Sequence, residues 1–317
     1  MTLSSQQTKA FSPFLKGALF GLTCAFIWAG WILITSTATK GRHLSIYDIT
    51  ALRFSVVGLF FLPVVLKRGF HIGRHGWLGI LIMSFGAGPP YILLAANGMS
   101  CANICQVGGL LPGTMPLFTA ILSVIVLRER ITLLRVFGLF LIIFGVFVLT
   151  GFNPFAFNAD FLMYYLSLLA ASLAWSCFTV SMRYWKVNPV HAAALVSVIS
   201  AAIYLPIYFF YLEPTVTQAP LNEILLQLFY QGVMAAIVGL ILYSKAVEIL
   251  GAARGAVFVA MVPVLATLMG IPFMGEWPSF FEWGAILTLT FGVLLATGAV
   301  FSWKQALGSV SQIRRKI

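Results

Sequence analysis

Residues 116–151 read PLFTAILSVIVLRERITLLRVFGLFLIIFGVFVLTG, and residues 263–298 read PVLATLMGIPFMGEWPSFFEWGAILTLTFGVLLATG. The two segments share residues at several places, always at an offset of 147 residues. The matches are Pro116 with Pro263, Glu129 with Glu276, Phe144-Gly145-Val146 with Phe291-Gly292-Val293, and Thr150-Gly151 with Thr297-Gly298. Upstream, Trp28 falls on Trp175 at the same offset. A register shared by separate positions indicates that one unit has been copied and fused to itself.

The composition assigns this duplicated unit to a lipid bilayer. Of 317 residues, 61% are hydrophobic and only 9% are charged, which leaves too few polar side chains to cover a water-facing surface. Backbone groups in lipid must be satisfied internally, so only helices or a closed barrel can span it. The apolar runs are continuous and do not alternate. The sequence therefore predicts an all-α membrane protein.

Apolar runs of roughly 20 residues, the length that crosses the hydrocarbon layer, predict ten transmembrane helices. We expect them at 17–38, 48–66, 76–97, 101–127, 132–151, 160–182, 189–210, 224–246, 252–274 and 279–303. Residues 1–151 would form the first five-helix repeat and residues 152–303 the second, followed by a basic tail at 304–317. An odd number of spans in each copy means that the second copy enters the membrane upside down.

The distribution of basic residues predicts the orientation. The net charge is +11, but the Lys and Arg residues stand in short loops between apolar runs and indicate topology, not a nucleic-acid partner. With the N-terminus in the cytoplasm, the outer loops hold only Lys40 and Arg42. Glu129 stands in the basic loop Arg128-Glu129-Arg130, whereas its counterpart Glu276 has no basic neighbour, as inversion requires. We expect both termini to be cytoplasmic.

Prolines and glycines interrupt the predicted fourth and ninth helices. Pro112 and Pro116 break the fourth, and Pro263 breaks the ninth at the position that matches Pro116. Transporters with inverted repeats bind their substrate near the middle of the bilayer, beside such interrupted helices. Prolines also simply kink packed helices, but the symmetric pair favours a hinge or gate.

Polar and aromatic residues inside the spans are the candidates for substrate contact, because such groups need a partner or a water-filled cavity in the membrane. Trp28 and Trp175 stand well inside their helices, away from the interfaces where tryptophan usually anchors, and could form two matched cavity walls or ordinary helix packing. The full set of predicted substrate contacts is Trp28, Tyr91, Asn103, Gln106, Trp175, Tyr243 and Arg254.

Three charged residues near helix ends are predicted to act at the gates. Glu129 and Glu276 stand at the ends of the fourth and ninth helices, near the membrane interface, where a carboxylate costs less free energy than inside the bilayer. Arg53 lies about one turn inside the second helix, so its side chain could reach the interface, pair with Glu276 or bind a substrate carboxylate.

The acidic residues all map to loops or helix ends, which leaves no carboxylate at mid-depth for proton-coupled cation transport. We therefore expect a neutral, zwitterionic or amphipathic solute. The four cysteines lack metal-ligand spacing and read as small apolar fillers. No metal site and no cofactor are expected.

Several sequence segments carry a family resemblance: Ala51-Leu52-Arg53-Phe54, residues 111–120 (LPGTMPLFTA) with Glu129-Arg130, Phe144-Gly145-Val146, residues 256–264 (AVFVAMVPV) and Gly275-Glu276. In these segments, and over essentially residues 15–303, the chain resembles the EamA family of the drug/metabolite transporter superfamily. The resemblance implies alternating access around a central cavity and transport of amino acids, metabolites, nucleobase-type compounds or drugs, often outward across a bacterial inner membrane. Small multidrug members of the superfamily use a glutamate in the first helix, and residues 17–38 contain none.

The sequence thus predicts a secondary transporter of a small organic metabolite, with export favoured over import. Drug efflux and uptake of nucleosides or metabolites remain alternatives within the same class. A channel or an intramembrane enzyme is disfavoured, because the breaks suit gates and no acids, histidines or metal ligands cluster in the spans. Substrate, coupling ion and oligomeric state, monomer or homodimer, stay open.

Overall fold

The computed structural model describes residues 13–41, 44–70, 76–151 and 159–299, and the predicted tail at 304–317 lies outside them. Every regular element in these ranges is a helix. The described part contains eight helices long and apolar enough to cross a membrane and two shorter apolar ones, Leu133–Leu149 and Phe280–Ala296. The predicted all-α fold with ten spans is therefore confirmed.

Several spans consist of consecutive helical pieces. The first repeat contains α1 (Pro13–Gly41), α2 (Ile46–Arg68), α3 (Gly76–Ala87) with α4 (Pro89–Met99), α5 (Ile104–Leu110) with α6 (Met115–Leu127), and α7 (Leu133–Leu149). The second contains α8 (Ala159–Trp185), α9 (Pro189–Tyr211), α10 (Leu221–Gln227) continuing through a π-helix (Leu228–Val238) into α11 (Gly239–Leu250), α12 (Ala252–Ala260) with α13 (Val262–Met274), and α14 (Phe280–Ala296).

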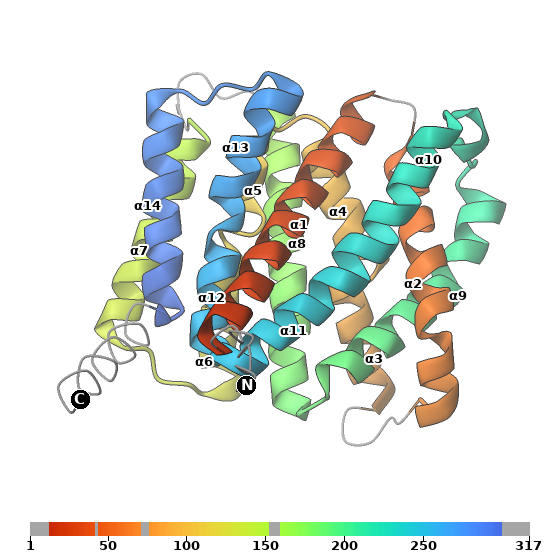
Figure 1. The fold of residues 1–317 in the computed structure, drawn as a ribbon, viewed down its shortest axis with the longest axis horizontal. Coiled ribbons are helices and arrows are strands. Elements are labelled where there is room, and N and C mark those ends of the chain that lie inside the picture. The colour runs from red at the N-terminus through yellow and green to blue at the C-terminus, as the bar shows by residue number, and fades with distance from the viewer. Residues whose placement is uncertain (1–12, 42–43, 71–75, 152–158, 300–317) are drawn as a thin grey trace, which may run out of the picture.

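The two copies run in opposite directions. In Figure 1 the connection between α6 and α7 lies at the lower face, whereas its counterpart between α13 and α14 lies at the upper face. α1 begins and α14 ends at the lower face (Figure 1). The upper face is the one that carries Glu276, and the lower face is the one that carries Glu129.

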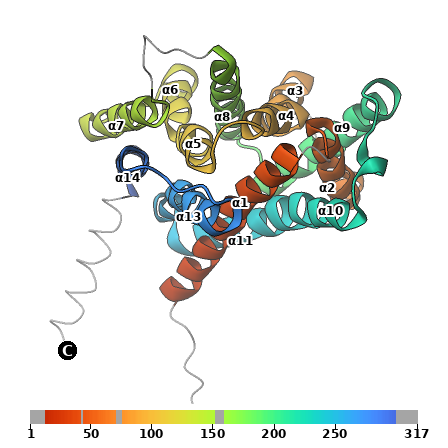
Figure 2. The ribbon, with the colours of Figure 1, turned by 90° about the horizontal axis from the view of Figure 1, so that it is seen from above.

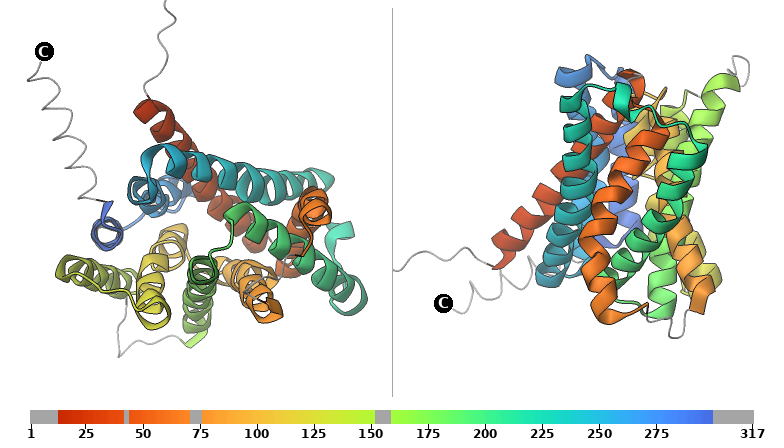
Figure 3. Two further views of the ribbon diagram at one scale, coloured as in Figure 1. Left: turned by 90° about the horizontal axis from the view of Figure 1, so that it is seen from below. Right: turned by 90° about the vertical axis from the view of Figure 1, so that its right-hand side faces the viewer.

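Each repeat lends its first helix to the other. α1 packs against α11 and α13 of the second repeat, and α8 packs against α3, α4 and α6 of the first. Figure 2 shows the resulting two rows of helices, and Figure 3 shows them from below and from the side. The rows meet through α7 with α14 at one end and through α2 with α9 at the other. The fold is therefore two interlocked layers.

The repeated Phe-Gly-Val motif holds one end of the layers together. A Cβ atom on Gly145 of α7 would come within 2.8 Å of the Leu289 Cβ atom, and one on Gly292 of α14 would come within 2.7 Å of the Gly138 carbonyl oxygen. Only glycine permits this approach, as small residues commonly do between membrane helices. The motif is a packing device between the repeats.

The predicted helix breaks are present. The fourth span is interrupted between α5 and α6 and the ninth between α12 and α13, and the third span is also interrupted, at Gly88 before Pro89. Pro116 and Pro263 are each the second residue of the helix that follows a break, where a missing amide costs nothing. The π-helix in the eighth span was not predicted, because no proline or glycine pair marks it in the sequence.

Candidate functional site: a cavity between the repeats

A cavity of about 640 Å³ lies between the two layers. Its wall is mostly apolar and comes from both repeats, as expected for a site that binds an organic molecule. Seven of the predicted site residues line it: Trp28, Arg53, Tyr91, Pro112, Pro116, Trp175 and Tyr243. The structure thus brings together residues that are up to 215 positions apart in the chain.

Two matched aromatic pairs face each other across the cavity. On one wall, Trp28 of α1 packs on Tyr243 of α11 with ring centroids 5.4 Å apart and an angle of 44°. On the other, Trp175 of α8 packs on Tyr91 of α4 with centroids 5.2 Å apart and the same angle of 44°. The two tryptophans are at equivalent positions of α1 and α8, whereas Tyr91 and Tyr243 are 152 residues apart and only lie in the corresponding spans. The repeated tryptophan therefore lines the cavity from both layers.

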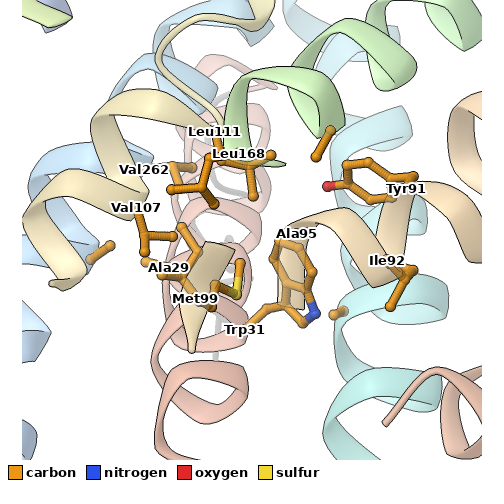
Figure 4. Close-up of a cluster of buried hydrophobic side chains, with 14 of the residues drawn as sticks. Ala29, Trp31, Tyr91, Ile92, Ala95, Met99, Val107, Leu111, Leu168 and Val262 are labelled. Carbon is orange, nitrogen blue, oxygen red and sulfur yellow. The ribbon is translucent and has the colours of Figure 1, made fainter. Parts of the chain in front are cut away.

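The upper end of the cavity departs from this symmetry. Trp31 of α1 lies stacked near Tyr91, with centroids 6.3 Å apart, and Figure 4 shows these two side chains coming from α1 and α4. The guanidinium carbon of Arg53 lies 6.0 Å from the Trp31 ring centroid, within range of a cation–π contact. Trp31 was not predicted, although it follows Trp28 by one helical turn on the same face.

The π-helix positions these side chains. A π-helix shifts backbone carbonyl groups out of the regular pattern, and such segments occur frequently at functional sites. Arg53 Nη1 donates to the Gln231 carbonyl oxygen at 3.4 Å, and Trp28 Nε1 donates to that of Ala235 at 3.3 Å. The carbonyls of this segment therefore orient two of the residues that line the cavity.

A buried polar network lies beside it. The Gln231 side chain accepts from Trp31 Nε1 at 2.7 Å and donates to Thr35 Oγ1 at 2.8 Å and to Gln227 Oε1 at 3.1 Å. Gln231 is fully buried, so each of these bonds satisfies a group that would be costly to leave unpaired in a membrane. The network fixes the Trp31 ring and ties α1 to the eighth span.

At the upper face Glu276 joins three helix ends, and we call this set of contacts the upper closure. Its Oε1 atom lies 2.7 Å from Lys40 Nζ at the end of α1, and its Oε2 atom accepts a hydrogen bond from the Ile104 backbone nitrogen at 2.6 Å. This one carboxylate therefore joins the ends of α13, α1 and α5. Its partner is Lys40 and not Arg53, whose side chain lies in the cavity.

Asn103 and Gln106 belong to this upper closure and not to the cavity lining of this conformation. They form a reciprocal cap at the start of α5, with Gln106 N donating to Asn103 Oδ1 at 2.8 Å and Asn103 N donating to Gln106 Oε1 at 3.1 Å. Asn103 Nδ2 also donates to Glu282 Oε1 at 3.0 Å. Arg254, in the first turn of α12, likewise lies outside the lining.

The lower face is more open. Glu129 pairs with Arg183 at the end of α8, and Arg183 Nη1 donates to Ser123 Oγ at 3.1 Å. The Arg183 and Glu129 side chains are 47% and 37% exposed, against 25% and 26% for Lys40 and Glu276. The cavity lining includes Pro189 and Glu248, which are exposed at this face. The cavity therefore communicates with the lower side.

Pro263 does not line the cavity but lies where the layers touch. A Cβ atom on Gly108 of α5 would lie 3.1 Å from the Pro263 Cα atom. The backbones of the interrupted fourth and ninth spans are therefore in direct contact just above the breaks.

Comparison with known proteins identifies the class. The model of the EamA-like transporter family matches residues 15–151 and again residues 162–298. An uncharacterized transporter of Bacillus subtilis, YoaV, is 22% identical over 247 residues, which cover 75% of this chain and 84% of that protein. An uncharacterized transporter of Archaeoglobus fulgidus is 24% identical over 271 residues, 82% of this chain and 91% of that protein.

Solved structures agree on the fold. One crystal structure superposes with a TM-score of 0.62 at 23% identity and covers 89% of this chain and 98% of its own. The match of the family model to both halves is what decides the assignment, because together the matched ranges span most of the chain. The chain is a multi-pass membrane protein that belongs to the EamA-like transporter family.

Proposed function

We propose that the chain is a secondary transporter that moves a small organic metabolite by alternating access, with the cavity between the repeats as its substrate site. The observation that carries the proposal is the asymmetry of an internally symmetric fold: the cavity reaches the lower face, while Glu276, Lys40 and Ile104 close the upper one. Inverted repeats allow each half to adopt the conformation of the other, which exchanges the open and closed faces.

Charge supports a cytoplasmic lower face. Among the described residues at the ends of the spans, the upper face carries Asp48, Glu213, Glu223, Glu276 and Glu282 with Lys40 as the basic residue, whereas the lower face carries Lys67, Arg68, Arg128, Arg130, Arg135, Arg183, Lys186 and Lys245 with Glu129 and Glu248. Basic residues concentrate on the cytoplasmic side of membrane proteins. The conformation is then inward-facing, with both termini in the cytoplasm of a bacterium, and it loads a substrate for export.

The repeat relation also predicts the second conformation. Glu129 is the counterpart of Glu276, and the start of α12 is the counterpart of the start of α5. When the lower face closes, Glu129 takes up a backbone amide at the start of α12 while Glu276 releases Ile104. Pro112, Pro116 and Pro263, at or beside the breaks, allow the helix segments to change their angles during this exchange.

Locking the upper closure tests alternating access. In a variant without native cysteines, Lys40→Cys with Glu276→Cys should be bridged by a short bifunctional thiol reagent, and transport in proteoliposomes should stop and return after cleavage of the linker. The matched control is Lys245→Cys with Glu248→Cys, which joins positions three residues apart on one helix. Transport that continues with the upper pair bridged would overturn the proposal and favour a channel whose path does not pass between Lys40 and Glu276.

The substrate for this assay comes from a ligand screen. Thermal stabilisation of the purified protein by amino acids, nucleosides, polyamines or drug-like compounds separates metabolite export from drug efflux and nucleoside uptake. Trp175→Ala should weaken the stabilisation by the true ligand, because it removes one wall of the cavity. A ligand response that is unchanged in Trp175→Ala would exclude the cavity as the binding site.

A further inference from the structure

We propose that Arg53 selects a substrate with an anionic head group, a carboxylate or a similar oxyanion, carried on an apolar or aromatic body. This inference rests on the proposed function and specifies the substrate class of the same cavity. A guanidinium group inside a membrane protein is costly unless an anion, a carbonyl group or water accompanies it.

Arg53 has a single hydrogen bond in the part of the chain that the structure describes. That bond, 3.4 Å long, goes to the Gln231 carbonyl oxygen, and no described carboxylate forms an ion pair with Arg53. A guanidinium carries five N–H donors in a planar fork that matches the two oxygens of a carboxylate. Arg53 lines the cavity, and apart from the bond to Gln231 the described residues offer its guanidinium no hydrogen-bond acceptor.

The fold does not require this charge. The second repeat has no charge at the equivalent position: α2 and its counterpart α9 are both 23 residues long with an internal proline at the same place, Pro63 and Pro206, and this register puts Val196 opposite Arg53. A residue needed for the architecture alone would be expected in both copies. The arginine is the element that makes the cavity asymmetric in charge.

The other charges of the cavity do not oppose an anion at this end. Among its lining residues the acidic one is Glu248, which is exposed at the lower face and pairs with Lys245 at 2.7 Å. Around Arg53 the wall is aromatic, with Trp31, Tyr91 and Trp175. Such faces would also attract a cation, but the adjacent guanidinium repels one, so the arrangement favours an anionic head with its apolar body against the rings.

A charge series on one molecular body tests the inference. The probes are 3-phenylpropionate, its neutral analogue 3-phenylpropionamide and the cation 3-phenylpropylamine, with binding measured by tryptophan fluorescence and thermal stabilisation of the purified full chain. We expect the propionate to bind about tenfold or more tighter than the amide, because a charge-assisted bidentate contact is roughly twice as strong as a neutral one. The amine should bind weakest.

Arg53→Gln should abolish the difference between propionate and amide, and Arg53→Lys should retain part of it because the charge remains without the fork. Arg68→Gln is the matched control, since Arg68 is an exposed arginine at the end of the same helix. Equal binding of amide and propionate, tighter binding of the amine, absence of binding by all three probes, or a preference that survives Arg53→Gln would each overturn the inference. If binding follows the expected order but no bound probe is transported, the inference stands and the proposed function fails.

Discussion

The two ends of the molecule carry the same glutamate in different surroundings. Glu276 at the upper face is three-quarters buried and bonds both to Lys40 and to the start of α5, whereas Glu129 at the lower face is paired with Arg183 in a more exposed position. The sequence repeat makes the two positions equivalent, and under the proposed alternating access their different contacts reflect the conformation of the molecule. An identical residue is a closure on one side and a surface ion pair on the other.

The largest effect is expected from Glu276→Gln. It removes the ion pair with Lys40 and the charge-assisted bond from the Ile104 amide, a loss of about 2 kcal/mol, which shifts the ratio of inward-facing to outward-facing molecules roughly 30-fold. The measurement is labelling of Ile32→Cys, a cavity position, by a membrane-impermeant maleimide added outside cells that carry the variant without native cysteines.

Lys40→Met provides the control for that experiment, because it removes the same ion pair but leaves the bond to Ile104. It should raise external labelling less than Glu276→Gln does, and the double variant should be no more open than Glu276→Gln alone. A larger effect of Lys40→Met than of Glu276→Gln would contradict the role assigned to the Ile104 contact.

A smaller effect in the same direction is expected from Asn103→Ala. The substitution removes the cap of α5 and the bond to Glu282, and loss of such a cap costs about 1 kcal/mol. External labelling of Ile32→Cys should therefore rise, by less than in Glu276→Gln. Asn103→Asp keeps the oxygen that caps α5 but replaces the hydrogen bond to Glu282 by repulsion between two carboxylates. External labelling as high as in Asn103→Ala would therefore show that the bond to Glu282, and not the cap, holds the upper face.

Glu129→Gln should act weakly and in the opposite direction. Its pair with Arg183 is partly exposed, and such pairs contribute about 0.5 kcal/mol, but the carboxylate is needed when the lower face closes. External labelling of Ile32→Cys should fall and transport should slow. Increased external labelling in Glu129→Gln would break the proposed exchange of roles between the two glutamates.

The smallest effect is expected from Glu248→Gln at the mouth of the cavity. Its pair with Lys245 is exposed and three residues apart on one helix, an arrangement that contributes about 0.3 kcal/mol. Thermal stability and external labelling should both stay near those of the parent protein. If Glu248→Gln lowered substrate affinity more than Arg53→Gln does, the charged group of the substrate would bind at the mouth of the cavity and not at its upper end.

Much of the site could be read from the sequence because the duplication marks it. Trp28 and Trp175 stood out through their shared offset, and both line the cavity together with Tyr91 and Tyr243. Trp31 could not be predicted in this way, because its counterpart at the offset of 147 residues is Phe178 and not a second tryptophan. A comparison of the two repeats cannot identify residues that occur in only one of them. Such residues, Trp31 and Arg53, make one end of the cavity different from the other.

Asn103 and Gln106 show a different limit. Their polar side chains within an apolar run suggested substrate contact, but their spacing of three residues is that of a reciprocal helix cap, as also found for Ser279 and Glu282. That spacing was a readable signal for a helix start at Ile104. The π-helix and the Lys40 partner of Glu276 gave no such signal, since each depends on residues from distant parts of the chain.

The sequence by itself determined the membrane environment, the number of spans and the inversion of the repeats, because these follow from apolar length, charge placement and an odd number of crossings. Only the tertiary structure decided which helices exchange between the layers, which face is closed and that Arg53 turns into the cavity. The physical reason is that local composition sets what a segment can do in lipid, whereas the partner of a buried charge is set by which other helix comes to lie beside it.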